Sequence, residues 1–148
     1  MSLSPLQIAR YQYAPKLPGM LRKGISEISV KTGEATQSVA DQEKIAALFP
    51  NTYGKNEVTF EIGKNTSEAK KQVVGVILSG GQAPGGHNVV CGLYDALKAT
   101  NADNVLYGFK GGPSGLLEDN YLIFDDAYIN QFRNTGGFDI IGSGRTKL

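Results

Sequence analysis

The chain has 148 residues, of which 41% are hydrophobic and 20% charged, and this composition predicts one folded domain rather than a disordered segment. Its formal net charge of +1 argues against sequence-independent nucleic-acid binding, which needs a strong basic excess, and no apolar run is long enough to cross a membrane. The single cysteine, Cys91, excludes an intrachain disulfide and a cysteine-based zinc site, and with no recognisable signal peptide we expect a cytoplasmic protein.

Glycine and charge divide the sequence into two halves. Residues 1–71 hold five of the 19 glycines and a net charge of +3, whereas residues 72–148 hold the other 14 glycines and a net charge of −2. We therefore expect an N-terminal α+β arm over 1–71, without catalytic spacing of its own, and a main α/β domain over 72–148. Dense glycine turns between strands and helices favour an anion or nucleotide site in the second half.

The first half predicts short elements. A Ser-Pro pair, typical of an N-cap and first helical residue, opens a helix expected over 4–13. Alternating polar and apolar residues predict strands over 27–31 and 57–62. Between them, Ser38 starts a weak capping box for a helix that we expect to bury Val39, Ile45, Ala46 and Phe49.

In the second half the spacing of apolar residues changes. Residues 73–78 are continuously apolar, as in a strand buried on both faces of a parallel sheet, and 104–109 predict a second such strand. Between them, apolar residues recur at helical spacing from Asn88, the expected N-cap, to about Ala99. This order predicts a β–loop–α–β unit.

Three more elements are expected towards the end of the chain. They are a short strand at 121–124, a helix opened by Asp125, and a third core strand over 138–141. The helix is expected to bury Ala127, Ile129 and Phe132. The whole pattern predicts an α/β fold in which a Rossmann-like parallel sheet with flanking helices follows the α+β arm.

A glycine-rich loop follows each expected core strand, at 79–88, 110–116 and 142–145. Carboxyl ends of parallel strands meet at one edge of a sheet, where ligands bind in such folds, and a glycine turn before a helix suits phosphate. The loop at 79–88 is neither a Walker A loop nor a G-x-G-x-x-G motif, and a plain connecting turn is the alternative. Arg145 adds a cation suited to phosphate oxygens, unless it is a solvated surface residue.

Two long motifs resemble the phosphofructokinase family. Residues 79–88 (SGGQAPGGHN) are similar to its first glycine signature, and 134–147 (NTGGFDIIGSGRTK) to its next one. Gln82, where the usual family pattern has Asp, and the His-Asn pair at 87–88 resemble the long, pyrophosphate-dependent branch, as does the arm. The resemblance covers essentially the whole chain and implies a partial phosphofructokinase domain.

The resemblance also implies which residues bind the phosphoryl donor. The backbone of the first loop glycine contacts the donor in the family, which points to Gly80 with Gly81 beside it. The arginine that closes the later loop contacts the transferred phosphoryl group, which points to Arg145 with Thr146 next to it. The loop after the second strand borders the far side of the donor, so Lys110, Gly111 and Gly112 are weaker candidates.

The implied function is reversible phosphorylation of fructose 6-phosphate at its 1-position by pyrophosphate, giving fructose 1,6-bisphosphate, in glycolysis. Family members carry their metal carboxylates and catalytic base beyond the arginine loop, so Mg²⁺ ligands and base are expected after residue 148. We therefore expect a fragment of a longer, homo-oligomeric enzyme that is inactive alone and binds neither nucleic acid nor membrane. An ATP-dependent 6-phosphofructokinase and a non-catalytic regulatory subunit are the alternatives.

Three further sites have simpler interpretations. His87 is the only histidine and is read as a loop residue that shapes the start of a helix. Cys91 is read as a small core residue rather than a nucleophile. Asp125 and Asp126 open a helix, where acidic residues favour the dipole, rather than forming a metal pair.

Overall fold

The computed structural model describes residues 3–24, 27–64 and 70–147, and the chain divides into two units. One unit comprises residues 1–15 with 68–148, and the other comprises residues 16–67. Helix α1 (Pro5–Gln12) therefore belongs to the later unit, whereas the sequence placed it in the arm over 1–71. The side-chain amide of Asn134 explains this grouping, because its Nδ2 donates to the carbonyls of Arg10 (2.9 Å) and Tyr13 (3.1 Å).

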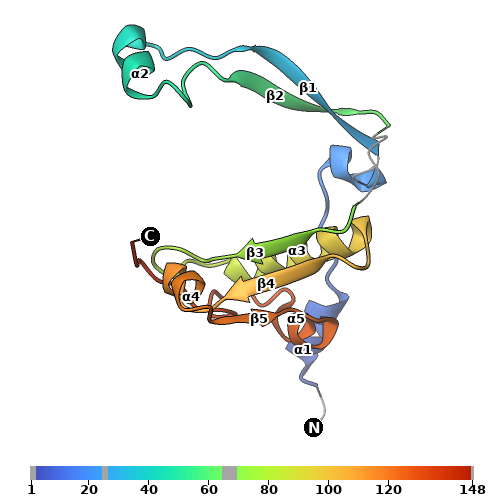
Figure 1. Ribbon diagram of the computed structural model, residues 1–148. Coiled ribbons are helices and arrows are strands. Elements are labelled where there is room, and N and C mark those ends of the chain that lie inside the picture. Colours follow the sequence, from blue (N-terminus) through green and yellow to red (C-terminus); the bar gives the residue numbers. More distant parts are fainter. Residues whose placement is uncertain (1–2, 25–26, 65–69, 148) are drawn as a thin grey trace. The chain divides into compact units, whose positions relative to one another are not determined.

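The unit over 16–67 is a twisted hairpin with a short helix between its strands (Figure 1). The described residues of this unit form η1 (Gly19–Lys23), β1 (Ile28–Ala35), α2 (Gln42–Leu48) and β2 (Asn56–Ile62). Strands β1 and β2 pair antiparallel, with Ile28 opposite Ile62.

Helix α2 differs from its prediction at its start and in its burial. Asp41 precedes it in the left-handed region (φ 53°), and the Ser38 hydroxyl donates to the carbonyl of Ala40 instead of capping the helix. Val39 and Phe49, expected in a core, are exposed, because this small unit offers them no apolar layer.

The larger unit contains a three-stranded sheet in the order β3-β4-β5. Strands β3 and β4 are parallel, with Val74 opposite Leu106, whereas β4 and β5 are antiparallel, with Gly108 opposite Leu122. The predicted parallel sheet is therefore a mixed sheet with one parallel pair. Its strands are β3 (Val73–Val76), β4 (Val105–Phe109) and β5 (Tyr121–Ile123), and the helices of this unit after α1 are α3 (Gly86–Thr100), α4 (Pro113–Leu117) and α5 (Asp126–Phe132).

Two helices begin where the sequence placed their caps. The Ser4 hydroxyl accepts from Gln7 N–H while the Gln7 side chain accepts from Ser4 N–H, which completes a capping box at α1. At α5 the Asp125 carboxylate accepts from Tyr128 N–H at 2.8 Å, so this aspartate caps the helix. Ile129 is fully buried as predicted and Phe132 lies against the core, but Ala127 is exposed.

The predicted third core strand over 138–141 is wrong. Ile140 and Ile141 are buried in the core, but their backbone forms no strand. Just after them, Gly144 forms an isolated parallel bridge with Ser79 that lies outside the three strands. The continuously apolar sequence therefore reflects burial of side chains from a loop.

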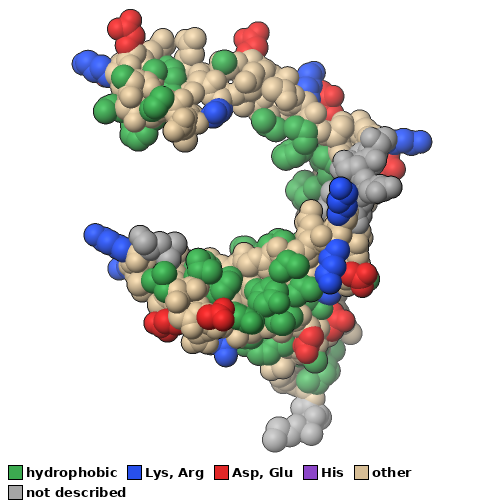
Figure 2. All heavy atoms as spheres, viewed as in Figure 1, with side chains coloured by type: hydrophobic (Ala, Val, Ile, Leu, Met, Phe, Trp, Pro, Cys, Tyr) green, Lys and Arg blue, Asp and Glu red, His purple; other side chains and the backbone are tan. Residues whose placement is uncertain are grey.

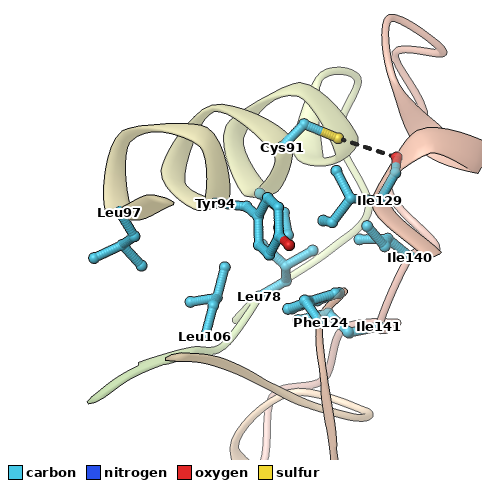
Figure 3. Close-up of a cluster of buried hydrophobic side chains, with 10 residues drawn as sticks. Leu78, Cys91, Tyr94, Leu97, Leu106, Phe124, Ile129, Ile140 and Ile141 are labelled. Carbon is cyan, nitrogen blue, oxygen red and sulfur yellow. Dashed lines mark hydrogen bonds between the residues drawn. The ribbon is translucent and has the colours of Figure 1, made fainter. Parts of the chain in front are cut away.

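The hydrophobic core lies between α3, α5 and one face of the sheet (Figure 3). Tyr94 points from α3 across the core, and its hydroxyl donates to Asp126 Oδ1 at 3.1 Å. Burial, and then the bond to the Asp126 carboxylate, raises the pKa of Tyr94. The buried set is Leu78, Val90, Cys91, Tyr94, Leu97, Leu106, Phe124, Ile129, Ile140 and Ile141.

The other face of the sheet is largely uncovered within the described residues. Val73 is 65% exposed and Ile123 is 55% exposed, and hydrophobic side chains gather over the sheet in Figure 2. Burial of β3 on both faces, expected from its continuous apolar run, is therefore wrong for this chain.

We predict that the 148-residue chain self-associates in solution. Edge strand β5 carries the exposed apolar residue Ile123 and offers unpaired backbone groups to a second copy. The substitution Ile123→Lys should shift sedimentation velocity profiles towards monomer, because a lysine on an edge strand opposes edge pairing. Val89→Lys, at an exposed apolar position on α3, is the matched control and should leave the profile unchanged. A monomeric wild-type chain over a wide concentration range would contradict the prediction.

Candidate functional site

The three predicted glycine loops converge at one edge of the larger unit. Gly80 N–H donates to the carbonyl of Gly144 at 2.9 Å, beside the bridge between Ser79 and Gly144. Gly111 N–H donates to the carbonyl of Ile141 at 2.8 Å. Residues that lie up to 64 positions apart in sequence are thereby joined by backbone hydrogen bonds, as the strand–loop pattern predicted.

Glycine is required where the second and third loops touch. A Cβ on Gly112 would meet the backbone nitrogen of Gly144 and lie 2.9 Å from its Cα, and a Cβ on Gly144 would meet the carbonyl oxygen of Gly111. Gly112 also has φ +80°, a conformation that side-chain-bearing residues rarely adopt. The two backbones can approach this closely only because neither residue has a side chain.

This contact places Arg145 beside the first glycine loop. A Cβ built on Gly81 would lie 3.0 Å from Arg145 Nη2 and 4.0 Å from Arg145 Cζ, so the guanidinium lies against the bare Cα of Gly81. The Arg145 side chain is exposed, and among the described residues it forms no ion pair. Its full positive charge is therefore available to a ligand. Thr146, the other residue predicted here, is exposed and adjacent in sequence.

Several amides at this edge are already used within the protein. Besides Gly80 N–H, the amides of Gly85 and His87 donate to the carbonyls of Gly136 (2.7 Å) and Gly137 (2.9 Å). Helix α3 starts after Gly85, which has φ +99°, so Asn88 lies within its first turn and is not the predicted N-cap. In the described part of the chain, Gly81 N–H has no hydrogen-bond partner, which makes it the amide of the Gly80–Gly81 pair that is free for an anion.

The weaker candidates belong to the second glycine loop, which contacts the third. Lys110 N–H donates to the carbonyl of Asn120 at 2.9 Å, while its side chain is exposed. Gly111 is exposed, but Gly112 is buried by its contact with Gly144. Of these residues, Lys110 contributes a positively charged side chain, and Gly112 allows the close approach of the Gly144 backbone.

His87 is the feature of this region that sequence reasoning underestimated. Its ring is 5% exposed in the first turn of α3, and both of its nitrogens contact the loop at 135–139. The only signal in the sequence is its place after two glycines, and nothing there identifies Thr135 and Asp139 as its partners.

Cys91 and the Asp125–Asp126 pair have structural roles, as the sequence indicated. Burial raises the pKa of the Cys91 thiol, whose Sγ lies 3.8 Å from the carbonyl of Ile129 in the core. Asp125 caps α5, and Asp126 accepts from Tyr94. Within the described ranges no three His, Cys, Asp or Glu side chains gather into a metal site, and no helix is long and apolar enough to cross a membrane.

A separate pocket of about 400 Å³ lies in the larger unit beside the end of α1. The ion pair between Arg133 and Asp95, with N–O distances of 2.6 and 2.7 Å, forms part of its wall. This pair raises the pKa of Arg133. The lining contains neither Gly81 nor Arg145, so the pocket is distinct from the glycine edge.

The close approach of the loops predicts opposite effects for two glycine-to-alanine substitutions. Gly112→Ala should lower the free energy of unfolding by at least about 1 kcal/mol, because of its positive φ and its contact with Gly144. Gly92→Ala, on an exposed face of α3 with open space around it, should raise it by about 0.5–1 kcal/mol through helix propensity. Denaturant unfolding followed by circular dichroism measures both, and equal effects would refute the proposed loop packing.

Comparison with known proteins gives strong similarity over the full chain. It is 51% identical over 148 residues to a pyrophosphate–fructose 6-phosphate 1-phosphotransferase of Porphyromonas gingivalis. Proteins with the same name from Treponema pallidum and Entamoeba histolytica are 43% and 45% identical over 157 and 148 residues. Each match covers 100% of this chain but only 26–27% of the relative, and no protein-family model matches. The chain is thus homologous, as a segment about a quarter of their length, to the pyrophosphate–fructose 6-phosphate 1-phosphotransferases, which confirms the resemblance drawn from its glycine motifs.

Proposed function

We propose that this chain is the phosphoryl-donor-binding part of an enzyme that phosphorylates fructose 6-phosphate at its 1-position with pyrophosphate, reversibly. The observation that carries the proposal is the position of the Arg145 guanidinium against Gly81, where three glycine loops meet. Homology over the whole chain to enzymes named for this reaction supports it. In this proposal the larger unit is a partial phosphofructokinase domain.

Arg145 and Gly81 have the chemistry that a phosphoryl group needs. Phosphoryl transfer depends on positioning and on neutralising the charge of the equatorial oxygens, more than on covalent chemistry by the protein. The planar guanidinium of Arg145 offers a two-pronged set of donors to such oxygens, and the free N–H of Gly81 offers a further donor beside it. The neighbouring residues Gly80 and Gly144 are joined by a backbone hydrogen bond, which fixes the main chain next to both groups.

The remaining predicted residues take secondary places in this proposal. Thr146 adds a hydroxyl next to Arg145, and Lys110 adds an exposed cation for the far end of the donor. Gly80 contributes through its backbone conformation (φ +106°), because a contact between its N–H and a phosphoryl oxygen requires its bond to Gly144 to open.

The sugar-activating base and the Mg²⁺ ligands are assigned to parts of the enzyme outside these 148 residues. The carboxylates in the described part of the chain do not gather into a metal site, so the proposal gives them no role in binding Mg²⁺. We further propose a cytoplasmic location, in keeping with the single buried cysteine, and a homo-oligomeric enzyme. Activity with pyrophosphate but not ATP separates the proposal from an ATP-dependent enzyme, and activity of either kind excludes a regulatory subunit.

The 148-residue chain alone should be inactive. It supplies groups for the phosphoryl donor but has no assigned base, and its described residues form no metal site. A coupled assay with fructose 6-phosphate, pyrophosphate and Mg²⁺ should show no turnover above background, while the full-length protein is active. Turnover by the purified chain would refute this division of roles.

In the full-length protein, Arg145→Lys should lower kcat about 100-fold or more, because lysine cannot reproduce the two-pronged contact with phosphoryl oxygens. The loss should appear mainly in kcat when pyrophosphate and fructose 6-phosphate are varied separately. Arg22→Lys, an exposed change in the unit over 16–67, is the matched control and should leave kcat unchanged. A kcat near that of the wild type for Arg145→Lys would overturn the assignment of Arg145.

A further inference from the structure

Beyond the donor site itself, His87 connects the start of α3 to the loop that leads to Arg145. Its side chain is almost fully buried, and it contacts Thr135 through Nδ1 and Asp139 through Nε2. Thr135 and Asp139 lie 48 and 52 positions further along the chain. The ring is therefore a long-range connection between the two glycine motifs.

The hydrogen bonds around the ring fix which nitrogen donates. The Thr135 hydroxyl donates to the carbonyl of Phe132 at 2.6 Å, so its oxygen is left to accept from His87 Nδ1–H, also at 2.6 Å. In the neutral ring Nε2 must then be an acceptor, and it receives Asp139 N–H at 3.0 Å. Every polar atom of the imidazole is thereby satisfied by the loop at 135–139.

Asp139 contacts the ring through both its backbone and its carboxylate. Its carboxylate Oδ1 lies 2.7 Å from Nε2, on the same nitrogen that accepts its backbone N–H. A neutral imidazole uses the N–H of Asp139, and an imidazolium instead donates to the carboxylate. The connection is thus maintained by one residue that offers both a donor and an acceptor.

The His87 ring is closely packed against the loop at 135–139 and against Phe132. A Cβ on Gly137 would meet the His87 ring, and the ring of Phe132 lies edge-on to it at a centroid distance of 4.9 Å. On the backbone, Gly85 and His87 donate to Gly136 and Gly137. The loop at 135–139 is therefore held against α3 from both its main chain and its side chains.

We propose that His87 is a positioning residue for Arg145, an inference that rests on the proposed function. From Asp139 the chain runs through the buried side chains of Ile140 and Ile141 directly to the loop at 142–145. By fixing Asp139 against α3, His87 sets the register of this stretch and hence the place of the Arg145 guanidinium against Gly81. His87 acts on the reaction through Arg145 and touches no substrate.

The test is steady-state kinetics on the full-length protein with five single variants, His87→Ala, His87→Gln, Thr135→Val, Leu97→Ala and Arg145→Lys, and the double variant that combines His87→Ala with Thr135→Val. His87→Ala should lower kcat about 10–100-fold, since misplacement by about 1 Å can cost that much, with the KM for fructose 6-phosphate nearly unchanged. His87→Gln should recover part of kcat, because its amide oxygen can accept from Asp139 N–H. Thr135→Val should lower kcat in the same sense, and adding it to His87→Ala should cost little more.

Leu97→Ala is the matched control, since Leu97 is a buried residue at the opposite end of α3. It should reduce thermal stability and leave kcat close to that of the wild type. If Leu97→Ala lowers kcat as much as His87→Ala does, the effect of His87 is general destabilisation and the inference fails.

The variants distinguish the positioning role of His87 from the assignment of Arg145. A large loss for Arg145→Lys with a normal kcat for both His87→Ala and Thr135→Val overturns the role of His87 alone. A normal kcat for Arg145→Lys overturns the assignment of Arg145 and the positioning role together. If His87→Ala does not fold, His87→Gln and Thr135→Val give the same comparison. Losses of kcat that add up when these two substitutions are combined would count against the connection.

Discussion

Contact between bare backbones holds the glycine edge together. Gly112 and Gly144 approach so closely that a side chain on either would meet the peptide atoms of the other loop. The hydrogen bonds from Gly80 to Gly144 and from Gly111 to Ile141 depend on this approach, because they join the same three loops. Arg145 follows Gly144 directly, so its position relative to Gly81 is inherited from a contact in which no side chain takes part.

This arrangement changes what the start of α3 can offer an anion. A helix N-terminus usually attracts phosphate through several unpaired N–H groups and the positive end of the helix dipole. Here the amides of Gly85 and His87 donate to the loop carbonyls of Gly136 and Gly137, so part of that capacity stabilises the protein itself. The charge of Arg145, which forms no ion pair within the described residues, is a cation at this edge that does not depend on free helix amides.

Two helix caps were predicted correctly from the sequence, two others, at Ser38 and Asn88, were wrong, and most long-range side-chain contacts could not be predicted. The caps at Ser4 and Asp125 were found because each uses a bond to a residue three positions away. The predicted strand over 138–141 failed because apolar residues in a buried loop have the same composition as a strand. The partners of His87 lie about 50 positions away, and no periodicity in one sequence connects them. The position of Arg145 in the third glycine loop was predicted through the family resemblance, because the whole motif over 134–147 is similar to a family signature.

For the sheet, the burial predicted from the sequence differs from the burial in the structure. The run at 73–78 is typical of a strand covered on both faces, yet Val73 is 65% exposed, and among the described residues the core covers the face towards α3. Apolar side chains that stay exposed on a strand do not gain the favourable free energy of burial. A continuous apolar run therefore stabilises a strand only where both of its faces are covered. The homologues are about four times as long as this chain. The apolar side chains of Val73 and Ile123 therefore suit the surroundings of a longer relative, whereas Leu106 and Val90 are buried in the core between α3, α5 and the sheet.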